Sequence, residues 1–330
     1  RNEYVVWLGT EHGLEFSVVP ADGFHLECIR IGGVRRKGIL NWVLAPFKLL
    51  LGIYDAVRLI HKYRPKVVLG MGGFASGPGG LAAWLLRCPL VIHEQNAVAG
   101  LTNRVLARFA TKVLQAFPGS FPHLINAETI GNPVRANIFQ VPPPEQRISA
   151  EVGPLRLLVL GGSQGALALN EVVPKAIAEL ANDESIFDVW HQTGYSTYEL
   201  ACKAYSCFGI EARIEPFIEN MELAYGWADL VVCRAGALTI AELAAAGIGS
   251  VLVPYPSAVD DHQTRNALFM TDSGAAVLLP QADLSARSLA DHLQLFAVDR
   301  ELLLSIAMNA RAQSSPNATD DLARACMNSS

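Results

Sequence analysis

The sequence predicts an α/β protein with two Rossmann-like, doubly wound domains, each a parallel sheet between layers of helices. Apolar residues make up 51% and charged residues 17% of the chain, which is typical of parallel strands buried on both faces. Apolar runs of strand length alternate with helical patterns, and an arrangement of strand, glycine turn and helix recurs along the chain. With 330 residues, the chain is long enough for two domains of ordinary size.

The predicted strands are short apolar runs bounded by glycine, proline or polar residues. Most are followed by a helical pattern, which favours parallel strands joined by helices. They span residues 4–8, 66–69, 90–92, 112–114, 155–160, 187–191, 230–233 and 250–253.

The most informative stretch is Leu157–Ala166, where an apolar strand ends in Gly161-Gly-Ser-Gln-Gly-Ala166 and a helix follows to about Leu180. Glycines let the backbone approach a ligand without an intervening Cβ, and the helix N-terminus presents unpaired N–H groups. The pattern therefore indicates a seat for a phosphate. The alternative is a tight strand-to-helix turn with no ligand.

An earlier segment repeats this design: an apolar strand, then Gly70-Met-Gly-Gly-Phe-Ala-Ser-Gly-Pro-Gly-Gly80, then a predicted helix over 81–86. Gly70-x-Gly-x-x-Ala75 can be read as a dinucleotide fingerprint. That fingerprint requires an acidic residue at the end of a second strand about 20 residues on, where this chain has His93-Glu-Gln-Asn96. A nicotinamide enzyme is therefore disfavoured.

A third unit of this kind carries a carboxylate. The strand 230–233 leads through Gly236 into a helix with Thr239 and Glu242 on one face. A carboxylate near a helix N-terminus can accept hydrogen bonds from both vicinal hydroxyls of a ribose. The alternative is a capping box, Thr239-x-x-Glu242, which needs no ligand.

The next polar segment follows Val253-Pro-Tyr-Pro256 and runs from Asp260 to Ala267. Its side chains suit either sugar hydroxyls or a solvated helix start. The chain has no Asp-x-Asp pair, so we expect no metal at a donor diphosphate. Helix N-termini at Gly162-Ser163 and Gly236-Ala237 would neutralise it instead.

A change in composition predicts the domain boundary. Gly131-Asn-Pro-Val-Arg135, a run of three prolines at 142–144 and a polar stretch to Gly153 are interpreted as an interdomain linker. We expect a first domain over 1–135, a second over 136–312, and a C-terminal segment, 313–330, that returns to the first.

Charge and cysteine content exclude several classes of protein. A net charge of -5 gives no reason to expect nucleic acid as a partner. Neither a secretory signal nor an apolar run of about 18 residues occurs, so no membrane span is expected. Scattered cysteines favour a reduced, cytoplasmic setting over disulfides or zinc: Cys28, Cys88, Cys202, Cys207, Cys233 and Cys326.

Together, the motifs at 70–80, 93–96, 131–135, 161–166 and 236–242 resemble the MurG family over essentially the whole chain. These bacterial transferases move N-acetylglucosamine from UDP-N-acetylglucosamine onto undecaprenyl-diphospho-muramoyl-pentapeptide, converting lipid I to lipid II. The resemblance implies a GT-B fold that binds acceptor in the first domain and donor in the second. It also implies a peripheral enzyme of peptidoglycan biosynthesis on the cytoplasmic face of the inner membrane, with other cell-wall synthesis proteins as partners.

The resemblance also assigns site residues by motif position. In the donor site, Asn96 contacts the sugar, Arg135 the nucleotide, Ser163 the diphosphate, Ile218 the uracil through its backbone, Glu242 the ribose, and Gln263 with His262 the sugar hydroxyls. The helix turn before Glu242 completes it: Ala237, Leu238, Thr239, Ile240 and Ala241. The lipid diphosphate is assigned to Gly72, Gly73, Ser76, Gly77, Gly79 and Gly80.

One departure concerns the start of the chain. The family opens with a Gly-Gly-Thr-Gly-Gly-His loop beside the reacting centre, and this sequence begins after it, so we expect one βα unit of roughly thirty residues to be missing. His93 is then the nearest substitute for the general base, unless it is a buried structural histidine. The leading hypothesis is an inverting transferase. The alternatives are an enzyme resembling UDP-N-acetylglucosamine 2-epimerase and a non-catalytic nucleotide-sugar-binding membrane protein.

The first domain carries a predicted membrane patch for an anionic surface. A basic run, Arg35-Arg-Lys37, precedes an apolar segment over 39–51. The alternative is an ordinary packed helix from Phe47 to Tyr63 with Pro46 at its start. The patch comprises Arg35, Arg36, Lys37, Ile39, Trp42, Val43, Phe47, Lys48, Leu50 and Trp84.

Overall fold

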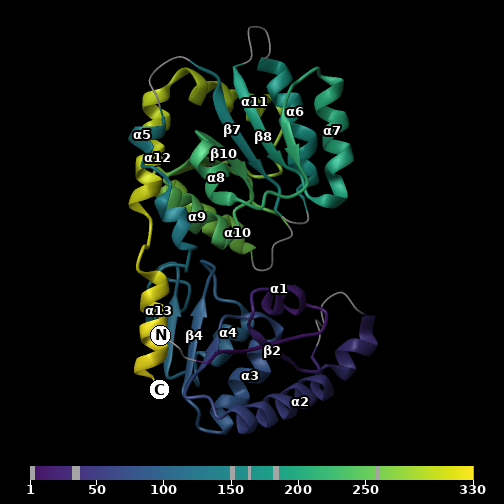
Figure 1. Cartoon of the computed structure of the whole chain (residues 1–330), viewed down its shortest axis with the longest axis vertical. Coiled ribbons are helices and arrows are strands. Elements are labelled where there is room, and N and C mark those ends of the chain that lie inside the picture. Colours follow the sequence, from purple (N-terminus) through teal and green to yellow (C-terminus); the bar gives the residue numbers. More distant parts are fainter. Residues whose placement is uncertain are drawn as a thin grey trace. The chain divides into compact units, whose positions relative to one another are not determined.

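The computed structural model describes residues 4–31, 38–148, 153–162, 165–180, 186–256 and 261–329, with no side-chain description for 38–45. The chain divides into two compact units (Figure 1). Unit 1 comprises Arg1–Ile130 and Asp320–Ser330, and unit 2 comprises Gly131–Thr319. Each unit has parallel strands and covering helices, so the predicted α/β class with two doubly wound domains is confirmed.

Unit 2 contains one six-stranded parallel sheet in the order β12-β11-β10-β7-β8-β9. Its central strands β7 and β10 consist mostly of Leu and Val and are buried except at Arg156, as expected for a sheet covered on both faces. The strands are β7 (Leu155–Leu160), β8 (Phe187–Gln192), β9 (Arg213–Glu215), β10 (Leu230–Cys233), β11 (Gly249–Leu252) and β12 (Ala276–Leu278).

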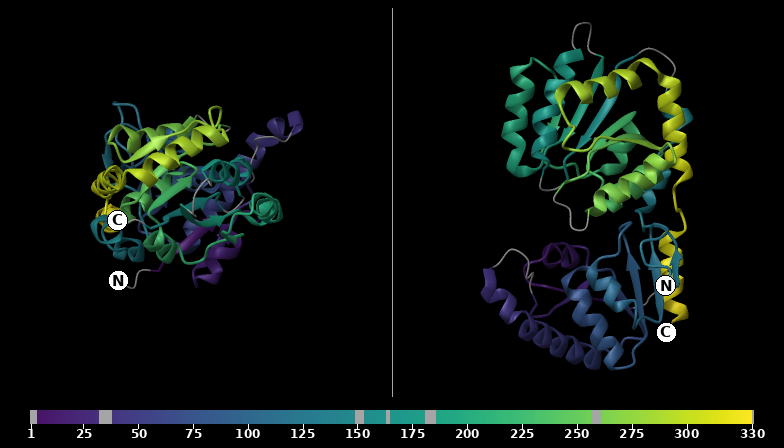
Figure 2. Two further views of the ribbon diagram at one scale, coloured as in Figure 1. Left: turned by 90° about the horizontal axis from the view of Figure 1, so that it is seen from above. Right: turned by 180° about the vertical axis from the view of Figure 1, so that it is seen from behind.

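The helices of unit 2 form two groups around this sheet (Figures 1 and 2). One group is α6 (Leu167–Leu180), α7 (Tyr198–Cys207) and α11 (Ala286–Val298); the other includes α8 (Met221–Trp227), α9 (Ala237–Ala246), α10 (His262–Asp272) and α12 (Arg300–Ala312). The main hydrophobic core lies between β7, β8, α6 and α11, where Leu157, Leu169 and Leu293 are completely buried. The remaining elements are η1 (Ala136–Gln140), α5 (Pro144–Arg147) and η2 (Tyr195–Thr197).

Unit 1 contains two parallel sheets. β1 (Val6–Gly9) pairs with β2 (His25–Cys28), and a second sheet has the order β3-β4-β5-β6. The second sheet consists of β3 (Val68–Gly70), β4 (Leu90–Glu94), β5 (Lys112–Gln115) and β6 (Ala127–Thr129), and the helices are α1 (Glu15–Ala21), α2 (Gly38–Tyr63), α3 (Gly73–Leu85) and α4 (Leu101–Leu106).

The C-terminal helix α13 (Ala318–Asn328) packs on unit 1. Leu322 and Ala325 of this helix join Val91, Leu114 and Ile130 in one hydrophobic cluster. The end of the chain therefore belongs to unit 1. The boundary between the units follows Ile130, a few residues before the boundary expected from composition.

The glycine-rich segment 70–80 differs from the sequence prediction, because helix α3 begins at Gly73 rather than at residue 81. A Cβ on Gly79 would lie 2.9 Å from Leu8 Cδ2, and one on Gly80 would lie 2.7 Å from Leu106 Cδ1. These glycines allow α3 to pack closely against β1 and α4. Tertiary packing thus overrides the low helix propensity that suggested a loop.

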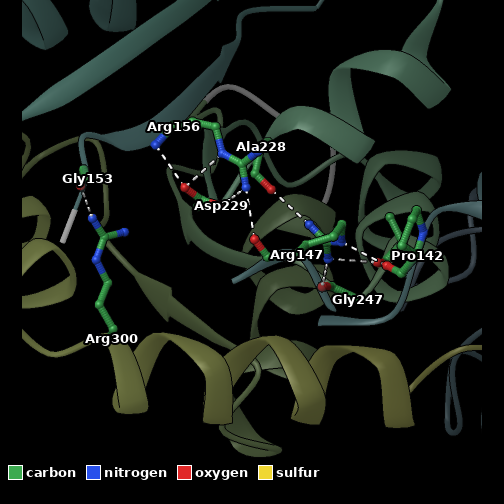
Figure 3. Close-up of polar contacts among 9 residues, drawn as sticks. Pro142, Arg147, Gly153, Arg156, Ala228, Asp229, Gly247 and Arg300 are labelled. Carbon is green, nitrogen blue, oxygen red and sulfur yellow. Dashed lines mark hydrogen bonds and ion pairs between the residues drawn. The ribbon is translucent and has the colours of Figure 1, made fainter. Parts of the chain in front are cut away.

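The segment interpreted as an interdomain linker is instead an integral part of unit 2. Ile138 and Val141 are buried, and Arg147 is 9% exposed. The Arg147 guanidinium donates to the carbonyls of Pro142, Ala228, Ala246 and Gly247 over 2.6–3.1 Å, tying α5 to the ends of α8 and α9 (Figure 3). Burial lowers the pKa of Arg147 to about 10.

Beside Arg147, an ion pair joins Arg156 of β7 to Asp229, the residue immediately before β10. Arg156 donates from its backbone N–H and its Nε to Asp229 Oδ2 over 3.0 and 3.1 Å (Figure 3). Arg156 also donates to the Arg147 carbonyl over 3.0 Å. The network fixes the amino-terminal edge of the sheet, opposite the edge where the strands end in glycine turns.

Candidate functional site

The two glycine turns of unit 2 lie side by side. Strands β7 and β10 are paired in parallel from Leu157↔Leu230 to Leu160↔Cys233, so the turns that follow them emerge at the same sheet edge. All the strands are parallel, but the order in which the chain adds them reverses between these two strands, since β8 and β9 lie on one side and β11 and β12 on the other. Such a switch point is where open α/β sheets bind ligands.

The turn after β7 requires glycine for conformational reasons. Gly165 has a φ of +80°, and a Cβ there would lie 2.4 Å from the Thr193 carbonyl oxygen. Gly162 has a φ of +76°, and a Cβ on it would have no neighbour within 4 Å. The backbone is thus tightly fixed at Gly165 and open to a ligand at Gly162. The predicted diphosphate residue, Ser163, lies outside the described residues.

The turn after β10 leads straight into α9, with Gly236 as the N-cap and no side-chain cap. Because the first N–H groups of a helix have no intrahelical acceptor, this end can bind an anion. Thr239 is the third residue of the helix rather than its cap, so the capping-box alternative is wrong. Within the same turn Leu238 is 55% exposed, whereas Ala237 and Ile240 are buried.

Glu242 lies one turn further along α9 and has two partners. Tyr225 Oη donates to Glu242 Oε2 over 3.0 Å, and Arg135 Nη2 donates to Oε1 over 3.0 Å. The Glu242 side chain is 20% exposed and that of Arg135 54%. Two residues that the resemblance assigned to the nucleotide are therefore in direct contact.

The backbone at Ile218 is held by a buried amide. Ile218 N donates to Gln192 Oε1 over 3.0 Å, and both residues are buried. Gln192 ends β8, so the sheet itself anchors the segment predicted to contact uracil. The Ile218 N–H is therefore already engaged within the unit.

The start of α10 is fixed by its own polar side chains. Gln263 Oε1 accepts from the Tyr255 N–H over 2.8 Å, and Asp261 has a left-handed backbone with a φ of +51°. Asn266 is buried and donates to the Ala235 carbonyl over 3.2 Å, which links α10 to the turn after β10. His262, the first residue of α10, thus lies at the same edge of the sheet, while residues 257–260 lie outside the described part of the chain.

In unit 1, a buried carboxylate organises the segment after β4. Glu94 Oε1 accepts from both the N–H and the Nδ2 of Asn96, over 3.0 and 3.2 Å. Glu94 Oε2 accepts from Gly100 N and from Asn103 Nδ2, over 3.0 and 2.8 Å. Asn96 is thereby held in place. His93 is completely buried within β4, which favours the structural alternative over the general base.

The start of α3 lies beside this segment. A Cβ on Gly72 would lie 3.6 Å from Asn103 Nδ2 and 3.8 Å from Gln95 Oε1. Gly72 and Gly73 have φ values of +82° and +80°, so the turn requires glycine. The positions assigned to the lipid diphosphate therefore differ: Gly72, Gly73, Ser76 and Gly77 are at least partly exposed, whereas Gly79 and Gly80 are buried against Leu8 and Leu106.

Helix α2 presents part of the predicted membrane patch. Phe47, Leu50 and Tyr54 are 64%, 63% and 56% exposed, while Ala56 is buried. The helix begins at Gly38, so the alternative of a helix that starts at Pro46 is wrong. Lys48 is half-buried, and Trp84 is 47% exposed with its ring 4.7 Å from that of Phe109. Arg35, Arg36 and Lys37, and the side chains of Ile39, Trp42 and Val43, lie outside the described part of the structure.

The described residues contain neither a membrane span nor a metal-ligand cluster. No helix among them is long and apolar enough to cross a membrane. Nor do they contain three or more His, Cys, Asp and Glu side chains grouped as metal ligands.

Comparison with known proteins identifies the family. The model of the glycosyltransferase family 28 C-terminal domain matches residues 156–322, and that of the N-terminal domain matches residues 1–115. The chain belongs to glycosyltransferase family 28. The matched regions contain the paired glycine turns, Glu242 and the Gly72 turn, so the family assignment and the local geometry concern the same residues.

Close relatives carry one name. The UDP-N-acetylglucosamine–N-acetylmuramyl-(pentapeptide) pyrophosphoryl-undecaprenol N-acetylglucosamine transferase of Nitrosococcus oceani is 52% identical over 323 residues, covering 98% of this chain and 90% of that protein. The protein of the same name from Marinobacter nauticus is 49% identical over 327 residues, covering 99% of this chain and 90% of its own.

Among solved structures, MurG of Acinetobacter baumannii superposes with a TM-score of 0.84 and 38% identity, covering 98% of this chain and 91% of that one. These likenesses confirm the predicted resemblance and the GT-B fold. The UDP-N-acetylglucosamine 2-epimerase of Neisseria meningitidis has a TM-score of 0.63 at 11% identity over 98% of this chain and 99% of that one, which shows a shared fold alone.

Sequence reasoning missed the residues that hold the site together. Tyr225, Gln192, Asn103 and Asn266 are buried polar residues whose partners lie 9 to 31 positions away in the sequence. For Asn266 the polar helix start around it was a signal, and for Tyr225 the only signal is a hydroxyl within an apolar helix. Buried polar groups of this kind are normally hydrogen-bonded, but the sequence does not name the partner.

Proposed function

We propose that this chain transfers N-acetylglucosamine from UDP-N-acetylglucosamine to the C4 hydroxyl of the muramoyl sugar of lipid I, forming lipid II for peptidoglycan. The observation that carries the proposal is the pair of glycine turns at the switch point of unit 2, with Glu242 in the second turn of α9. Relatives named for this reaction are about half identical over nearly the whole chain, which favours a transferase over an epimerase.

The donor lies along the edge of the unit 2 sheet at which β7 and β10 end. Uracil binds at Ile218, where its N3–H can donate to the backbone carbonyl. Glu242 accepts from the ribose hydroxyls, with Arg135 beside it. The diphosphate lies at the turns containing Gly162 and Gly236, whose backbone donors act without a divalent metal. The sugar reaches His262 and Gln263 at the start of α10.

The reaction is a displacement at the anomeric carbon with inversion. The acceptor C4 oxygen attacks, the bond to the diphosphate oxygen breaks, and UDP leaves with its negative charge at the two helix N-termini. A general base takes the hydroxyl proton. Close packing at Gly165 and the start of α9 after Gly236 hold backbone N–H groups that can stabilise the leaving group electrostatically.

The acceptor and the membrane belong to unit 1. The lipid diphosphate binds at the N-terminus of α3, beside the Glu94 network. The exposed apolar face of α2 lies on an anionic membrane, which keeps the enzyme peripheral on the cytoplasmic side, near other cell-wall synthesis proteins.

Calorimetric titration with UDP tests the donor site. We expect Glu242→Ala to weaken UDP binding by about 1 to 3 kcal/mol, the usual cost of losing a charged hydrogen-bond partner. Glu199→Ala, on the exposed surface of α7, is the control and should bind UDP normally. EDTA should leave wild-type binding unchanged, and lost affinity in EDTA would refute the metal-free site.

A transfer assay tests the acceptor. The protein and labelled UDP-N-acetylglucosamine are supplied with lipid I in vesicles, and labelled lipid II is the expected product. In the calorimetric titration, normal UDP affinity of Glu242→Ala would show that Glu242 does not bind the ribose. Formation of UDP-N-acetylmannosamine, or of free N-acetylmannosamine and UDP by hydrolysis, with or without lipid I, would favour the epimerase.

A further inference from the structure

The buried side chain of Tyr225 forms a hydrogen bond with Glu242, the residue proposed to bind the ribose. It lies on α8, is 1% exposed, and donates to Glu242 Oε2 over 3.0 Å. Burial raises the pKa of the Tyr225 phenol well above its usual range, and the nearby Glu242 carboxylate adds to this effect. The hydroxyl therefore stays protonated and can only be the donor in this bond.

The two oxygens of Glu242 have partners of different kinds. Oε2 faces a donor that is enclosed in the unit, and Oε1 faces an arginine that is more than half exposed. An ionised carboxylate has about four lone-pair directions, two on each oxygen. With Tyr225 and Arg135 using one each, one direction remains on each oxygen, which matches the two hydroxyls of a vicinal diol.

We propose that Tyr225 is a positioning residue, which orients the Glu242 carboxylate so that its free edge accepts both ribose hydroxyls of the donor. The inference rests on the proposed donor site and adds the group that fixes its carboxylate. Without the phenol, the Glu242 side chain is held only by an exposed arginine and can rotate. A bidentate acceptor then becomes an unoriented charge, and binding must order it first.

The test compares UDP with 2′,3′-dideoxy-UDP in wild type and Tyr225→Phe. We expect Tyr225→Phe to raise the Kd for UDP about 5- to 10-fold, because one oriented charged hydrogen bond is lost. The Kd for the dideoxy nucleotide should be the same in both proteins. In the transfer assay, the KM for the donor should rise while kcat is unchanged, because Tyr225 does not touch the reacting atoms.

Tyr205→Phe is the matched control. Tyr205 is also 1% exposed in unit 2, and its hydroxyl is 2.9 Å from His191 Nδ1 on β8. This variant loses a buried tyrosine hydroxyl elsewhere in the unit. It should lose thermal stability as Tyr225→Phe does and bind UDP like wild type.

The outcomes separate the two claims. Failure of wild type to bind UDP would contradict the proposed function itself. If wild type binds UDP and Glu242→Ala weakens it, an unchanged Kd in Tyr225→Phe would overturn the positioning role. Equal losses for UDP and the dideoxy nucleotide would also overturn it, since they would indicate a general structural defect.

Discussion

At the scale of single residues, Arg147 is a buried cation whose guanidinium is surrounded by carbonyl oxygens. We expect Arg147→Met to lower the free energy of unfolding of unit 2 by about 3 to 5 kcal/mol, because methionine keeps the apolar stem but leaves buried carbonyls unpaired. Urea unfolding followed by tryptophan fluorescence measures the change. Arg300→Met, which removes one hydrogen bond to the Gly153 carbonyl (Figure 3), should cost about 1 kcal/mol or less. Equal losses in the two variants would contradict the buried-network argument.

The same residue shows where sequence reasoning stops. Glu242 was predicted because its place after a strand and a glycine turn has a chemical meaning on its own. Arg147 lies in a proline-rich, polar stretch that is typical of a linker, and three of its four carbonyl acceptors are 81 to 100 positions away in the sequence. Tyr225 and its bond to Glu242 are missing from the sequence prediction for the same reason. Motif residues are predictable, but the buried partners that orient them depend on the tertiary fold.

At the scale of elements, α2 exposes apolar side chains that a packed helix would bury. Phe47 and Leu50 are three residues apart on one face and are 64% and 63% exposed. We expect Phe47→Ser with Leu50→Ser to reduce cosedimentation with anionic vesicles several-fold, because inserted apolar side chains supply the hydrophobic part of membrane binding. Binding of the unchanged protein should weaken as salt is raised or neutral lipid is substituted, since basic residues supply the rest.

A second exposed pair provides the control for this experiment. Leu295 and Val298 on α11 of unit 2 have the same spacing and are 47% and 79% exposed. Leu295→Ser with Val298→Ser should leave vesicle binding unchanged. If both double variants lose binding equally, general hydrophobicity rather than α2 is responsible, and if the unchanged protein does not bind at all, the membrane patch is wrong.

The strands show which elements a sequence can predict. All eight predicted strands are present, and each predicted end lies within two residues of the observed end. The strands that were missed are β2, β6, β9 and β12, which have three or four residues and lie at or near sheet edges. A short strand with polar residues, such as Arg213–Glu215, has too little alternation or hydrophobicity to stand out. The strand is stabilised by its pairing with β8, which the local sequence pattern does not indicate.

At the scale of the whole molecule, stability should be unevenly distributed along the chain. Among the described residues, β1 and β2 form a sheet of two strands. Tyr4, just before β1, is 74% exposed, and Phe16 and Phe24 between the two strands are 53% and 48% exposed. By contrast, every residue of β4 is buried, and the strand pairs on both sides, with β3 and β5. A two-stranded sheet with much of its apolar surface in water is marginally stable.

Hydrogen exchange should therefore be fastest, among the strands of unit 1, in residues 6–9 and 25–28, and slowest in residues 90–94 and 112–115. Exchange from core strands approaches the global unfolding free energy, whereas poorly buried segments open locally at much lower cost. UDP should slow exchange around β10 and α9 while leaving the β1–β2 pair unchanged, because a ligand stabilises the unit that binds it. Equal protection of β1 and β4 in the isolated chain would contradict this gradient, and would mean that the exposed aromatic side chains of the first segment contribute to a packed surface in solution.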